Sequence, residues 1–158
     1  MKKKDLILIT IIFSVALISF GAISLIERLS GAEDGVAVVY HERTEILRID
    51  LRDGSYEIID EEFVYTDHEL FDEHTYIVRG MKGSNQDHRL YHDGYYVVKI
   101  QYRDHKVHVE DEESPQNICQ HQGATNSPLR PLTCLPNQVV ITIETGIFDP
   151  DDDDIIIE

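Results

Sequence analysis

The sequence predicts an all-β domain, a small barrel or sandwich, behind one N-terminal transmembrane helix. An uncharged apolar run covers residues 6–26. After residue 35, short segments alternate apolar with polar residues, which is the period of a strand with one buried face. No segment beyond the apolar run shows a sustained helical period, and about eight short strands are typical of a barrel or a sandwich.

The apolar run LILITIIFSVALISFGAISLI is long enough for a membrane anchor. A helix of this length, at about 1.5 Å per residue, spans roughly the 30 Å of a bilayer's hydrocarbon core. Lys2–Lys4 precede the run, whereas Glu27 and Arg28 cancel each other after it. The positive-inside rule therefore predicts a cytosolic N-terminus and an exterior C-terminal part. A cleaved signal peptide ending near residues 19–21 and a buried core helix are the alternatives.

A membrane anchor at residues 6–26 divides the chain into five segments. We expect a cytosolic basic tip (1–5), a transmembrane anchor (6–26), a linker (27–35), a β domain (36–145) and an acidic tail (146–158).

The part of the chain after residue 29 is strongly acidic. It contains 28 of the chain's 30 acidic residues and 10 of its 14 basic residues, which gives it a net charge of −18. Such a charge repels phosphate backbones, so we expect no nucleic-acid partner. It favours cations or basic partners, or is simply a well-solvated surface.

The strands are expected in chain order, with turns at 52–54 and 104–105. Alternating apolar residues mark them at 36–40, 47–51, 56–58, 76–78, 96–102, 107–109 and 139–143. Residues 60–73 fit a strand, a loop or a short helix, and residues 80–94 are expected to form a long exposed loop. We identify no internal repeat, and we expect the eight histidines to lie on the surface.

Both cysteines lie between Ser114 and the last strand. Residues 115–122 suit a short turn of helix ended by a glycine with positive φ at Gly123, and Pro136-Asn137 suits a tight turn. Cys119 and Cys134 could form a structural disulfide, remain buried free thiols, act as a redox pair or bind a metal. The CxxC spacing of a redox pair is absent, and a metal would need two more ligands, with only His121 nearby in sequence.

The cysteine segment resembles the NusG domain II family. The resemblance rests on Cys119, Gly123 and the run Cys134-Leu135-Pro136-Asn137, after a KVHV strand at residues 106–109. Ser114 stands where many relatives have a further cysteine. The resemblance implies a small extracytoplasmic β domain without a defined reaction, in which these residues have structural roles.

We find no catalytic motif, and we expect no enzyme activity, no metal and no cofactor. The run Asp151–Asp154 lacks the spaced ligands and glycine of a calcium loop. The function expected is that of a membrane-anchored, extracytoplasmic accessory or interaction domain of a bacterial surface, with a partner that the sequence does not identify. The resemblance also implies an alternative, an accessory of membrane electron transfer or thiol redox chemistry. A role in transcription elongation is opposed by the anchor and the acidic charge.

Overall fold

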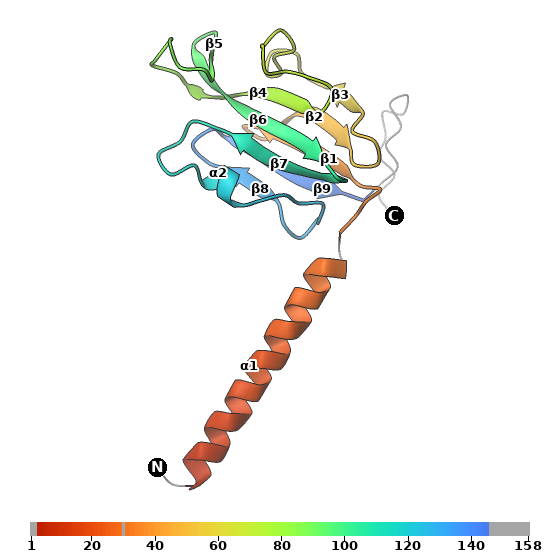
Figure 1. Cartoon of the computed structure of the whole chain (residues 1–158), viewed down its shortest axis with the longest axis vertical. Helices are drawn as coiled ribbons and strands as arrows, with labels where there is room; N and C mark the ends of the chain where they lie inside the picture. The colour runs from red at the N-terminus through yellow and green to blue at the C-terminus, as the bar shows by residue number, and fades with distance from the viewer. Residues whose placement is uncertain (1–2, 30, 146–158) are drawn as a thin grey trace. The chain divides into compact units, whose positions relative to one another are not determined.

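The computed structural model describes residues 3–29 and 31–145 as a helix and a β domain that begins at Ala32 (Figure 1). Helix α1 spans Lys3–Leu29. From Ile9 to Ile26 its large apolar side chains are exposed, and this is the one described helix that is long and apolar enough to cross a membrane. Ser14 is satisfied within the helix, because its Oγ donates to the Thr10 carbonyl at 2.8 Å. The predicted acidic tail, with its aspartate run, lies outside the described residues.

The β domain contains two antiparallel sheets. The first has the order β3-β2-β1-β9-β8, with β1 (Val36–His41) paired to both β2 (Thr44–Asp50) and β9 (Val139–Glu144). Its edges are β3 (Tyr56–Ile58) and β8 (Leu132–Cys134). In the second sheet β6 (Tyr95–Arg103) pairs with β4 (Thr75–Lys82) on one side. On its other side it pairs with β5 (Tyr91–His92) and β7 (Lys106–Asp111).

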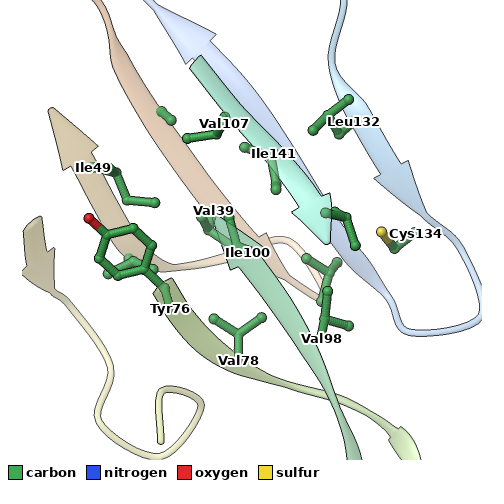
Figure 2. Packing of buried hydrophobic residues seen from close by; sticks show 14 of the residues in the cluster. Val39, Ile49, Tyr76, Val78, Val98, Ile100, Val107, Leu132, Cys134 and Ile141 are labelled. Carbon is green, nitrogen blue, oxygen red and sulfur yellow. The ribbon is translucent and has the colours of Figure 1, made fainter. Parts of the chain in front are cut away.

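The main core lies between the two sheets, as Figure 2 shows. Val39 and Ile141 of the first sheet pack in one cluster with Val78, Val98 and Ile100 of the second. Strand β9 alternates buried and half-buried residues, as its period of two predicts. The predicted all-β class is therefore confirmed, and the described strands form a sandwich-like arrangement rather than a closed barrel.

The prediction that residues 80–94 form a long exposed loop is partly wrong. Strand β4 continues to Lys82, and β5 is formed by Tyr91 and His92. Leu90 is buried with Ile77 and Val97 in a second, smaller cluster, to which Leu70 and Phe71 add. The carbonyl of Leu90 also accepts the Val97 N–H at 2.8 Å, so this part of the segment is fixed to β6.

An internal repeat is present, contrary to the sequence-based expectation. Residues 64–80 and 84–100 share the pattern of turns followed by a strand, with an offset of twenty residues. In each copy a histidine Nδ1 accepts the N–H of the leucine two residues later, at 3.1 Å for Leu70 and 3.2 Å for Leu90. The small cluster uses equivalent residues of both copies. The identical pairs are Asp67 and Asp87, His68 and His88, Leu70 and Leu90, Tyr76 and Tyr96, and Val78 and Val98.

Candidate functional site: the cysteine cassette

The cysteine cassette, residues 112–138, runs from the end of β7 through the short helix α2 (Ile118–His121) and β8 to the turn before β9. Cys119 of α2 and Cys134 of β8 are joined by a disulfide, with their Cα atoms 5.3 Å apart. Both side chains are buried, at 1% and 0% exposure. The bond therefore fixes α2 against the edge strand β8.

Asn137 is the buried centre of the turn that follows Cys134. Its Nδ2 donates to Glu112 Oε2 at 2.7 Å, and its Oδ1 accepts the Met81 N–H at 3.0 Å. Its own N–H donates to the Cys134 carbonyl at 3.1 Å, which closes the turn. The amide thus connects the cassette to β4 of the other sheet. A Cβ at Gly80 would lie 2.6 Å from Asn137 Oδ1, so only glycine leaves room for this contact.

Glu112 is a buried carboxylate, with 2% exposure, directly beneath the disulfide segment. Besides Asn137 it accepts the Cys119 N–H at 2.9 Å and the Ser114 hydroxyl at 3.1 Å, both on Oε1. Three donors therefore satisfy it, as a buried charge requires. The sequence reading missed this residue, because the run Glu110–Glu113 has the composition of a solvated surface.

Gly123 has φ +73°, the positive value expected at the end of α2. The side chain of the residue before it, Gln122, makes the two hydrogen bonds to the β8 backbone that a neighbouring strand would otherwise make. Its Nε2 donates to the Thr133 carbonyl at 2.8 Å, and its Oε1 accepts the Thr133 N–H at 2.9 Å. The Arg130 guanidinium donates to the Gln122 carbonyl. These contacts tie the loop before β8 to the end of the helix.

The remaining predicted cassette residues face solvent or the turn. Pro136 lies in the turn that Asn137 closes, and the Leu135 side chain is 78% exposed. His121 is also exposed, and its Nδ1 lies 2.7 Å from the Asn117 carbonyl. The structure thus brings together Cys119, Cys134 and Asn137 but leaves Leu135 outside their contacts.

Two of the eight histidines are buried, which corrects the expectation of surface positions. His41 packs on Phe63 with ring centroids 4.7 Å apart, and neither ring nitrogen has a hydrogen-bond partner among the described residues. Burial lowers the pKa of His41 because the charged form is poorly solvated there. Burial, and then the neighbouring His92, lowers the pKa of His68. Neither histidine lies in the cassette.

The model of the family described as NusG domain II matches residues 6–146. The chain belongs to the NusG domain II family. No curated protein and no solved structure matches the chain. The family match includes both the apolar span Ile9–Ile26 and the whole β sandwich.

Proposed function

We propose that this NusG domain II chain is a single-pass membrane protein whose β domain acts outside the cytosol as a non-enzymatic accessory or interaction domain. Residues 6–26 form the anchor, residues 1–5 lie in the cytosol, and residues 36–145 form the exterior domain. The observation that carries the proposal is the disulfide between Cys119 and Cys134 in a domain that follows a helix with a long uncharged apolar run. Disulfides persist in oxidising compartments and are rare in the cytosol.

The interaction surface that we propose lies on the cassette. Residues 114–143 contain no Asp or Glu, although the exterior part of the chain has a net charge of −18. Three large apolar side chains are exposed there, Ile118 at 52%, Leu129 at 65% and Leu135 at 78%. Ile118 and Leu135 each adjoin one half of the disulfide, which fixes their backbones close together. Exposed apolar groups on a segment without acidic residues suit a protein partner with an apolar surface.

Chemical crosslinking in membranes, followed by purification in mild detergent, tests this proposal. A partner should co-purify with the wild-type chain and be lost in Leu135→Asp and Ile118→Asp. Gln86→Asp is the matched control, because residue 86 is also exposed but lies outside the cassette. A solitary monomer in several detergents, or equal recovery of the partner with all three variants, would contradict the proposal.

The alternative function, an accessory of thiol redox or electron transfer, has less support. A buried carboxylate beside a disulfide is compatible with it, but an attacking thiolate must reach a sulfur atom. Both sulfur-bearing side chains are shielded, at 1% exposure or less. The two functions differ in the rate of reduction by an external dithiol, which should be slow and limited by opening of the domain if the disulfide is structural.

A further inference from the structure

The cassette holds three ligand atoms of a kind that binds thiophilic metals. A carboxylate oxygen of Glu112 and the sulfur atoms of Cys119 and Cys134 all lie within 4.8 Å of one another. The three residues are buried: Glu112 directly follows β7, Cys119 belongs to α2 and Cys134 to β8. Within the described part of the chain, no second group of three such atoms comes this close. Sequence spacing could not reveal this set, because its third member is not a cysteine or a histidine.

The Glu112 carboxylate is held in place by three hydrogen bonds. The Cys119 N–H and the Ser114 hydroxyl occupy Oε1, and Asn137 Nδ2 occupies Oε2, at 2.7–3.1 Å. An ionised carboxylate has about four acceptor positions, so one remains for a cation. Hydrogen-bonded partners that orient a ligand in this way are typical of protein metal sites.

We propose that the dithiol form of this chain binds one thiophilic divalent cation, typified by Zn²⁺, through Cys119, Cys134 and Glu112. Zn²⁺ takes sulfur and carboxylate ligands in a tetrahedral set, and the Ser114 hydroxyl or a water molecule supplies the fourth ligand. The dithiol is the form that translation produces, so binding itself needs no reductant. This inference is independent of the proposed interaction surface.

Metal binding and disulfide formation exclude each other. Oxidation joins the two sulfur atoms and removes two electrons and two protons to an oxidant, which leaves no thiolate to coordinate a cation. Metal binding instead releases the thiol protons and leaves the electrons on sulfur. Two thiolates and one carboxylate then place three negative charges around two positive ones, whereas in the empty site both cysteines keep their protons as neutral thiols. A bound cation should therefore protect the thiols against oxidation and alkylation.

Cadmium titration of the full-length chain in detergent tests the proposal. The chain is reduced with a phosphine, desalted without oxygen and titrated with Cd²⁺, whose thiolate charge-transfer band in the ultraviolet reports sulfur coordination. We expect the band to saturate at one Cd²⁺ per chain and Zn²⁺ to displace it. The oxidised form of the same preparation should give no band. A reduced chain without a saturable band would overturn the proposal.

Variants of Glu112 and its neighbours distinguish binding at the proposed three-ligand site from binding by the two thiols alone. Glu112→Gln should weaken Cd²⁺ binding at least tenfold, whereas Glu113→Gln, the same change at the neighbouring half-exposed residue, should leave it within twofold. Equal affinities of the two variants would overturn the role of Glu112. If the Glu112→Gln variant does not fold, the Cd²⁺ affinity of the Ser114→Cys variant tests the proposed site instead. It adds a third sulfur beside Glu112 and should tighten binding at least tenfold, and an unchanged affinity would refute the geometry.

Discussion

Removal of the Asn137 amide should be among the most damaging single changes in the β domain. Asn137→Ala leaves Glu112 without its closest donor, at 2.7 Å, and leaves the Met81 N–H without its acceptor. A lost hydrogen bond to a charged group and an unsatisfied, partly buried N–H together cost about 3–5 kcal/mol. Urea unfolding of the full-length chain in detergent, followed by the tyrosine circular dichroism signal, measures this loss.

Two further variants sharpen the test. Asn85→Ala is the matched control, because Asn85 is exposed and its Oδ1 accepts only the Asp87 N–H of its own turn. It should cost less than about 1 kcal/mol. Asn137→Asp puts a second carboxylate where Glu112 now has a donor, so it should destabilise at least as much as alanine. If Asn137→Ala costs no more than Asn85→Ala, the buried network does not stabilise the fold as we infer.

Three further predictions concern the disulfide, a glycine and the buried histidines. Reduction of the disulfide should lower the free energy of unfolding by about 3 kcal/mol, for a loop of about 15 residues; urea curves with and without reductant measure it, and the double cysteine-to-alanine variant should not respond to reductant. Gly80→Ala should cost about 1–3 kcal/mol because its Cβ would lie 2.6 Å from the Asn137 side chain, whereas Gly21→Ala in α1 should leave the unfolding of the β domain unchanged. Below pH 6.5 the unfolded chain binds protons that His41 and His68, with their lowered pKa values, do not bind in the folded domain. Stability should therefore be complete above pH 6.5 and fall as the pH decreases towards the folded pKa values, and His41→Phe should flatten this fall; an unchanged pH profile would show that His41 is not the group responsible.

Local sequence patterns predicted the strands and turns whose conformation depends mainly on residues close to one another in sequence. Strand β9 alternates as expected, and Gly123 has the positive φ predicted from its place after a short helical turn. The turn at Pro136-Asn137 also forms where its residue types indicate, since its hydrogen bond runs to Cys134, three residues back. Such features depend on neighbours in sequence, so they can be predicted from the sequence alone.

Features that depend on contacts distant in sequence could not be predicted in this way. The buried Glu112 accepts one of its three hydrogen bonds from Asn137, 25 residues later. Leu90 is buried because its segment folds onto β6, although the surrounding residues are polar and rich in glycine. The repeat around His68 and His88 begins in turns with little apolar periodicity, and the two equivalent hydrogen bonds of these histidines connect its identical residues to a shared structure.

Membrane topology tests the proposed anchor and exterior domain most directly. Gln86→Cys places a thiol on an exposed loop of the β domain, and Lys2→Cys places one before the apolar run. The unsubstituted chain is the blank, because its cysteines are joined. In intact cells a membrane-impermeant maleimide should label Gln86→Cys at once and label Lys2→Cys only after the membrane is opened. Labelling of Lys2→Cys in intact cells without labelling of Gln86→Cys would contradict the proposed orientation.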